Sequence, residues 1–455
     1  MKTLHRRCPG LDVHSDSVVA CVRLTVRTKV SHEVRRFSTT TRDLLELRDW
    51  LAAQEVAHVA MEATGVYWKP IWHILEGRFE LVLANAAHIR NVPGRKSDVN
   101  DAVWISDLLA HGLIRASFVP PNPIQEVRDL TRTRTQLTRE VAQHIQRIQK
   151  TLEDANIKLV SVISDIMGMS GRRILKAMIA GETNAMRLSE LGSARLKCSR
   201  SDLAVALDGR VTAHHRFLID HHLGLIEELE RRIAAFDARI EELLAPFRDA
   251  IEQLITIPRV GRVAAEVILA EIGPDMTPFL TAGHLLSWAG VVPRLDQSAD
   301  KRRSTRVRHG APWLKPVLVQ CAWGAVRAKG TYLQAQFFRL KARRGPEKAA
   351  IAVAASILTA VYHMLKDGTF YQDLGSDYLV KRNAAKTAAK LARRIKDLGF
   401  EVQLSSGCVS AFPASAFPGS FWVDYAETRR NTNEALVPPN PKEFESTMST
   451  SRCFD

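Results

Sequence analysis

The sequence predicts a fold of the α/β plus α class, in which a mixed sheet is followed by mainly helical regions. Strand-like and helix-like periods alternate over the first hundred or so residues. From about Pro123 the apolar residues repeat with the spacing of long helices, and the last fifty residues lose all periodicity. A chain of 455 residues is too long for one compact core. We therefore expect two or three domains.

The first domain is predicted over residues 1–122. Period-2 alternation indicates strands, and a threonine before a 3.6-residue period indicates a capped helix. On these patterns we predict a strand pair at 11–26 and 32–39, a Thr-capped amphipathic helix at 40–54, and further strands within 56–64 and 79–87. Strands mixed with helices in this order indicate an α/β domain with a mixed sheet.

A helical stalk is predicted over residues 123–250. Apolar residues step by threes and fours through Leu137, Val141, Ile145, Ile148 and Leu152, and again through Leu225, Leu229, Ile233, Phe236 and Ile240. Such spacing is typical of a coiled coil or a helix hairpin. Because these helices more often join domains or subunits than carry chemistry, we expect an oligomer contact here, in a dimer or tetramer.

A mainly helical C-terminal domain is predicted over residues 251–400, and a mostly disordered tail over 401–455. The segment "ITIPRVGRVAAEVILAEIG" resembles a helix-hairpin-helix, which presents turn amides and a helix N-terminus to a phosphate. Arg259 stands where that motif usually has glycine, so a simple helical corner is an equally good interpretation. The paired histidines His214, His215, His221 and His222 are weak candidates for a metal site.

Composition indicates a polyanionic partner in the cytoplasm. The net charge of +15 favours nucleic acid, although charge alone does not separate DNA from RNA or an acidic membrane. The N-terminus has no apolar signal region, and no stretch approaches the roughly 20 apolar residues of a membrane span. The six cysteines lack the spacing of a zinc site, and we expect them to be reduced.

Four carboxylates are candidates for a magnesium site. Asp12 and Glu62 interrupt apolar strand segments, where a charge is costly unless it is paired or binds a metal. Asp98 and Asp101 share one face of a predicted helix that Ser97 would cap. Together the four side chains could hold two Mg²⁺ ions. Taken singly, Asp98 and Asp101 are ordinary first-turn acids, and Asp12 could simply end a strand.

These residues also carry a family resemblance. The segments "GLDVHSDSVVACV", "VAMEATGVYWKPIWHILE", "NVPGRKSDVNDAVWISDLLAHGLI" and "SFVPP" resemble the N-terminal domain of the DEDD transposases of the insertion-sequence "one-ten" family, relatives of the Piv invertase. The resemblance implies an RNase H-like (RuvC-like) domain, with Asp12, Glu62, Asp98 and Asp101 as catalytic Mg²⁺ ligands.

The second half is similar to the C-terminal transposase domain of the same family, through "LLSWAGVVPRLDQSADKRRSTRVRHGAPWLKPVLVQCAW". The resemblance places a serine nucleophile at Ser298, with Ser304 as the second candidate. Asp300 stands where the family tends to have glycine, beside the nucleophile. For phosphate binding we predict a cluster of basic residues after the serine: Lys301, Arg302, Arg303, Arg306 and Arg308.

The resemblance implies an enzyme that cuts and rejoins the DNA of an insertion sequence, guided by a structured non-coding RNA encoded by the element. Two other functions fit the same residues. One is a junction-resolving nuclease, in which the carboxylates hydrolyse DNA without Ser298. The other is a non-catalytic nucleic-acid-binding remnant of a transposon.

Overall fold

The computed structural model describes residues 3–27, 29–85, 98–293, 296–298, 301–304, 306–382 and 384–401. The tail predicted after residue 401 therefore lies outside the described residues, as does Ser97. The chain divides into two compact units, Met1–Glu126 and Val127–Asp455, and each unit is described by itself.

The first unit contains a five-stranded mixed sheet with the strand order β3-β2-β1-β4-β5. β1, β2 and β3 are antiparallel neighbours, whereas β4 runs parallel to β1 and β5 runs parallel to β4. The strands are β1 (Arg7–Val13), β2 (Ser17–Val26), β3 (Lys29–Ser38), β4 (His58–Glu62) and β5 (Glu80–Ala84). The mixed sheet is confirmed, and each predicted segment contains strand. The segment 11–26 was wrongly predicted as one strand, because it contains the end of β1, a turn and all of β2.

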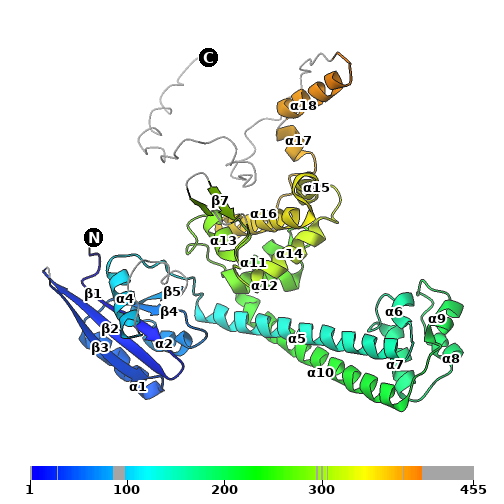
Figure 1. Ribbon diagram of the computed structural model, residues 1–455, viewed down its shortest axis with the longest axis horizontal. Coiled ribbons are helices and arrows are strands. Elements are labelled where there is room, and N and C mark those ends of the chain that lie inside the picture. The colour runs from blue at the N-terminus through cyan, green and yellow to red at the C-terminus, as the bar shows by residue number, and fades with distance from the viewer. Residues whose placement is uncertain are drawn as a thin grey trace, which may run out of the picture. The chain divides into compact units, whose positions relative to one another are not determined.

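Helices cover both faces of this sheet (Figure 1). On one face, α1 (Thr41–Ala53) and α2 (Trp68–Leu75) pack on alternate strand residues such as Leu11 and Met61. On the other, α4 (Asp98–Ala110) packs on Cys8 and Ala60. Thr40 caps α1 as predicted, since its side chain accepts a hydrogen bond from the backbone of Asp43.

A long helical hairpin is formed by α5 (Asn122–Asp154), whose first residues belong to the first unit, and α10 (Ala213–Leu244). Four shorter helices lie at its far end: α6 (Leu159–Val162), α7 (Met169–Ile179), α8 (Ala185–Glu190) and α9 (Arg200–Leu207). Ile148 and Leu152 of the predicted stripe are buried together with these short helices. On α10 the neighbouring Ile226 is buried there instead of Leu225, which the prediction placed in the stripe and which is exposed. Part of the predicted heptad stripe is therefore used within the chain, and a coiled coil between chains stays a prediction.

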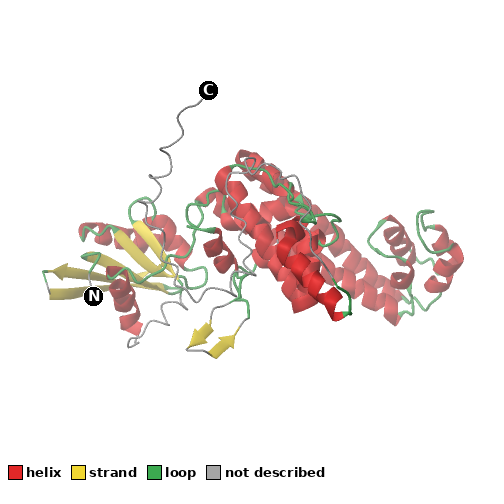
Figure 2. Cartoon of the chain, turned by 90° about the horizontal axis from the view of Figure 1, so that it is seen from above, coloured by secondary structure: helices red, strands yellow, loops and turns green. Residues whose placement is uncertain are grey.

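The rest of the second unit is mainly helical, with one small hairpin of strands (Figure 2). Its elements are η1 (Ala245–Phe247), α11 (Arg248–Ile255), α12 (Arg262–Ile272), α13 (Ala282–Ala289), β6 (Asp296–Ser298), β7 (Lys301–Ser304), α14 (Leu314–Ala325), α15 (Tyr332–Arg344), α16 (Pro346–Asp367), α17 (Tyr378–Arg382) and α18 (Ala384–Asp397). α13, α14 and α15 pack around α16, which is the core helix of this region.

α16 is long and apolar enough to cross a membrane by length and composition, so the prediction that no stretch approaches a membrane span was wrong. However, 56% of its most apolar window is buried within the protein. Its buried residues include Val353, Ile357 and Val361, as expected for a helix at the centre of a helical core.

Candidate active site

Two of the predicted carboxylates lie on adjacent parallel strands. β1 and β4 pair in the register Gly10 with Ala60 and Leu11 with Met61, so the next positions are Asp12 and Glu62. Leu11 and Met61 belong to the core under α1 and α2. Because side chains alternate along a strand, Asp12 and Glu62 are on the opposite face, where α4 lies. The sheet therefore places both carboxylates at the same strand ends and on the same face.

α4 crosses β1 in the antiparallel direction and directs its first turn towards these carboxylates. The backbone of Leu4 donates to the carbonyl of Ala110 (2.8 Å), and the Cys8 thiol lies 3.5 Å from the carbonyl of Ser106. A Cβ on Gly10 would lie 2.4 Å from the carbonyl oxygen of Ala102. Each step along β1 thus moves towards the start of α4, and the next residue on this face is Asp12.

Asp98 and Asp101 belong to that first turn of α4. Asp101 is half-buried and lies one turn before Ile105, which is fully buried against the sheet. Asp98 begins the helix, but its side chain lies outside the described residues. The structure therefore brings the segments that carry Asp12, Glu62, Asp98 and Asp101 to one region of the first unit.

Asp12 is 7% exposed, and its Oδ2 lies 3.1 Å from Nε2 of His14. The described side chains contain no group of three or more His, Cys, Asp or Glu residues that could hold a metal ion. The donors at the strand ends are carboxylate oxygens, which suit Mg²⁺, an ion that binds one or two carboxylates and keeps several waters. By the chemistry of its donors, the site fits the predicted ion. The contact between His14 and Asp12 was not predicted from the sequence, although the spacing of two residues along a strand places both side chains on the same face.

Ser298 lies in the second unit, at the end of β6. Ser298 pairs with Lys301 of β7, and an isolated bridge between Pro293 and Val307 lies closer to the helical core. The side chains of residues 294–305 lie outside the described residues. Among these undescribed side chains are those of Ser298, Ser304, Asp300, Lys301, Arg302 and Arg303. Arg306 and Arg308 follow the hairpin and are exposed, as phosphate contacts need to be.

The two chain segments that flank this hairpin meet at a pair of glycines, which we call the hairpin neck (Gly290 and Gly310). Both have positive φ, of +71° and +61°. A Cβ on Gly290 would lie 2.6 Å from Cα of Gly310, and one on Gly310 would lie 2.2 Å from the carbonyl oxygen of Ala289. Only glycine fits at either position.

The chain beyond the hairpin neck is held by α5. The guanidinium groups of Arg132 and Arg139 lie 5.7 and 5.3 Å from the ring centroid of Trp313, within the range of a cation–π contact. Arg132 also binds both carboxylate oxygens of buried Glu271 on α12, at 2.7 and 2.9 Å. The helix that continues from the first unit thus contacts both α12 and the segment that leads out of the serine hairpin.

The predicted helix-hairpin-helix corresponds to α11, a short turn and α12. Arg259 in this turn has φ of +67°, a conformation that favours glycine, and its side chain is exposed. This explains why the motif usually has glycine there. The turn geometry is compatible with a phosphate contact and with a simple helical corner, and both interpretations stay predictions.

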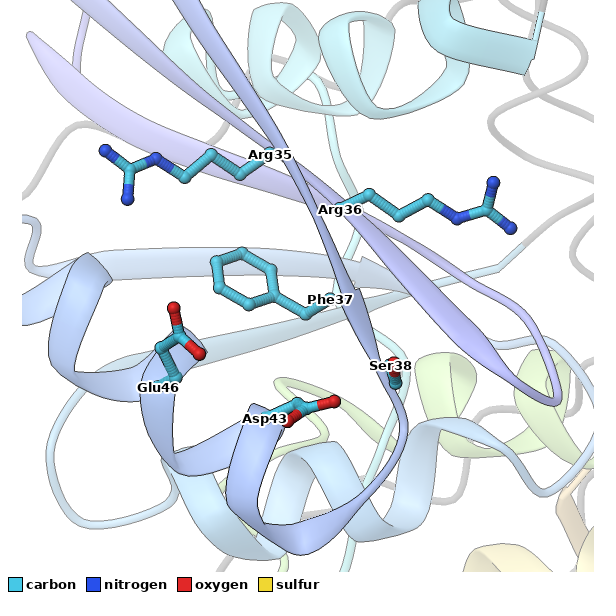
Figure 3. Close-up of a pocket in the computed structure, with 6 residues that line it drawn as sticks. All are labelled: Arg35, Arg36, Phe37, Ser38, Asp43 and Glu46. Carbon is cyan, nitrogen blue, oxygen red and sulfur yellow. The ribbon is translucent and has the colours of Figure 1, made fainter.

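A separate cavity lies between the end of β3 and the start of α1 (Figure 3). It is lined by Arg35, Arg36, Phe37, Ser38, Asp43 and Glu46. None of the predicted site residues lines it. The candidate active site is therefore assigned from the strand ends and α4, and not from this cavity.

Comparisons with known proteins agree with the arrangement in both units. Residues 9–157 match a family model described as "Transposase", for DEDD transposases of the IS110 type. Residues 251–337 match the model "Transposase IS116/IS110/IS902 family".

The chain is also 32% identical over 142 residues to the "Insertion element IS110 uncharacterized 43.6 kDa protein" of Streptomyces coelicolor. That alignment covers 30% of this chain and 34% of the relative, so the chain spans about a third of the relative's length. With both family models matched in order, this chain belongs to the IS110 family of DEDD transposases.

Proposed function

We propose that this protein is an insertion-sequence transposase that cuts and rejoins DNA strands, with Asp12, Glu62, Asp98 and Asp101 as its carboxylates and Ser298 as its nucleophile. The observation that carries the proposal is the meeting of β1, β4 and the first turn of α4. A sheet of three antiparallel strands extended by two parallel ones supports an RNase H-like fold for this unit.

The carboxylates would hold Mg²⁺. When bound, the ions would stabilise negative charge on the attacked phosphate and on the leaving oxygen. The chain contributes the geometry: the backbone register fixes Asp12 beside Glu62, and His14 contacts one oxygen of Asp12. Burial of Asp12 keeps its carboxylate in one orientation, which favours a preorganised site.

Ser298 would act through its Oγ, which forms a bond to phosphorus while the bond from phosphorus to the leaving sugar oxygen breaks. The serine proton passes to a base, and the leaving oxygen is protonated. Rejoining reverses these steps with a different strand, so the energy of the phosphodiester is conserved without ATP. Exposed Arg306 and Arg308, together with the basic residues of β7, would neutralise the phosphate charge.

We further propose that an element-encoded non-coding RNA selects the DNA and that the protein acts as a dimer or tetramer. When base pairing reads the sequence, a protein needs only to read shape and backbone. Basic side chains spread over the second unit support this division of labour, since Lys390, Arg393 and Arg394 on α18 are also exposed. The heptad spacing of α5 and α10 supports the oligomer.

The test is to trap the covalent intermediate. Full-length protein is incubated with Mg²⁺, DNA of the element end and RNA transcribed from the flanking DNA, and adducts that survive denaturation are measured. We expect an adduct with wild type and with Ser304→Ala, but none with Ser298→Ala or Asp12→Ala. An adduct lost only in Ser304→Ala would move the nucleophile to that residue. Strand cleavage without any adduct would replace the proposal by a junction nuclease.

A further inference from the structure

We infer that Arg23 and Asp107 are a positioning pair that fixes α4, and with it Asp101, in register on the sheet. The inference rests on the proposed function of the carboxylates. Nε of Arg23 donates to Oδ1 of Asp107 at 2.8 Å, and Nη1 donates to the hydroxyl of Thr25 at 2.6 Å. Nε2 of His32 lies 3.3 Å from the same carboxylate oxygen. Residues of β2 and β3 thus hold one carboxylate of α4.

The pair is largely buried on the side of β2. The Arg23 side chain is 5% exposed, whereas that of Asp107 is 34% exposed. A bond from a guanidinium to a carboxylate depends on direction as well as distance, unlike an apolar contact. Because Arg23 is also held by Thr25, its position on β2 is fixed, and its bond to Asp107 favours one orientation of α4.

Where α4 crosses β1, its contact with the sheet uses small residues, since Gly10 faces Ala102 and Ser106. Larger side chains of α4, Ile105, Leu108 and Leu109, are buried on the same face of the sheet. Small side chains allow close approach but form few ridges that resist sliding or rotation. The bond between Arg23 and Asp107 therefore adds to this packing a directional contact between two charged groups.

The consequence for the site follows from helix geometry. Asp107 lies six residues after Asp101, about 9 Å along the helix axis at 1.5 Å per residue. A slip of one residue would move Asp101 by about 1.5 Å and rotate it by about 100°. Functional side chains need to be held within about 0.5 Å of their working geometry. Loss of the pair should therefore reduce metal binding at Asp12 and Asp101 although neither residue is changed.

The experiment measures Mn²⁺ binding to the full-length chain by electron paramagnetic resonance, with Mn²⁺ itself as the probe. We expect Arg23→Met to weaken binding about tenfold, the lower end of what loss of a residue that orients a ligand typically causes. Asp107→Asn keeps an oxygen that accepts from Arg23 and should bind close to wild type. Asp12→Ala serves as the reference for a lost site.

Leu47→Ala is the matched control for stability. Leu47 is fully buried in α1, on the opposite face of the sheet, so its truncation should cost about 2–5 kcal/mol without touching α4. If Leu47→Ala binds Mn²⁺ as weakly as Arg23→Met, the pair is merely structural and the inference fails. If Arg23→Met binds like wild type while Asp12→Ala does not, the inference fails and the metal site stands. Equal binding by wild type and Asp12→Ala overturns both.

Discussion

A single missing side chain allows the candidate active site of the first unit to assemble. Gly10 lies where α4 crosses β1, and any Cβ there would approach the backbone of Ala102 and Ser106 to 2.4 Å. Such a distance is far inside van der Waals contact, and helix backbone cannot move as a flexible side chain can. Gly10 is therefore required by packing and not by backbone conformation.

At the residue scale we predict that Gly10→Ala destabilises the protein and reduces strand transfer. Overpacking of this kind costs about 1–3 kcal/mol or more, because α4 must move away from β1. Chemical denaturation measures the loss. Gly224→Ala is the control, since a Cβ there meets nothing within 4 Å on α10 and should stabilise by about 0.5–1 kcal/mol. Equal effects of the two substitutions would contradict this account.

The residues of the candidate site differ in how far the sequence could predict them. Asp12 and Glu62 were found because a carboxylate within an apolar strand is unusual, and their place in the register agrees with that interpretation. Gly10 and the pair of Arg23 and Asp107 were missed. Their importance comes from contacts with residues 84 or more positions away, and no local pattern marks them.

At the element scale, the helical hairpin contains a contact between two histidines, of which the sequence pattern pointed only to His222. Nδ1 of His144 on α5 lies 3.2 Å from Nδ1 of His222 on α10, and Arg147 lies 3.5 Å from His144. Desolvation lowers the pKa of both histidines from the ordinary 6.5. Positive neighbours lower each pKa further: Arg147 acts on His144, and His144 acts on His222. The hairpin thus favours neutral histidines.

We predict that acid weakens this hairpin. A histidine whose pKa is lowered by folding binds fewer protons in the folded state, so its contribution to stability is present above 6.5 and is lost as the pH falls below that value. The free energy of unfolding should therefore drop more in wild type than in the double variant His144→Gln/His222→Gln between about pH 7.5 and about pH 5.5. Parallel pH curves for the two proteins would refute the prediction.

The elements themselves were predicted where one period runs for many residues. α5 and α10 follow from their apolar spacing, and α1 from Thr40 and its amphipathic pattern. α6 to α9 were not resolved as separate elements, because each is only 4 to 11 residues long. Their apolar residues make sense only once they pack on Ile148, Leu152 and Ile226.

At the scale of the whole molecule, the basic side chains behind the net charge of +15 are not all equally available to bind an anion. On α10, exposed Arg231, Arg232 and Arg239 each pair with a glutamate of the same helix. Lys390, Arg393 and Arg394 on α18 are exposed beside few acidic residues, since Asp397 is the one carboxylate in that helix. Counting charges by type alone, as sequence composition does, does not distinguish these two sets.

We predict that the α18 set contacts nucleic acid backbone. The triple variant Lys390→Ala/Arg393→Ala/Arg394→Ala should reduce the salt dependence of binding to a duplex DNA, with the slope of log K against log salt smaller by about two to three. The control, Arg231→Ala/Arg232→Ala/Arg239→Ala, removes the same charge from α10 and should change the slope little. A similar change in both variants would mean that only net charge matters.

The hairpin neck has a consequence for how this chain can evolve. The chain leaves the helical core at Gly290 and returns to it at Gly310, where the two backbones touch. Substitutions, insertions or deletions beyond buried Val291 need not displace Ala289 or Ala311, since both ends of the loop are anchored at one point. The serine loop can thus diverge, or be exchanged between related elements as a cassette, while the helices that carry it retain their packing.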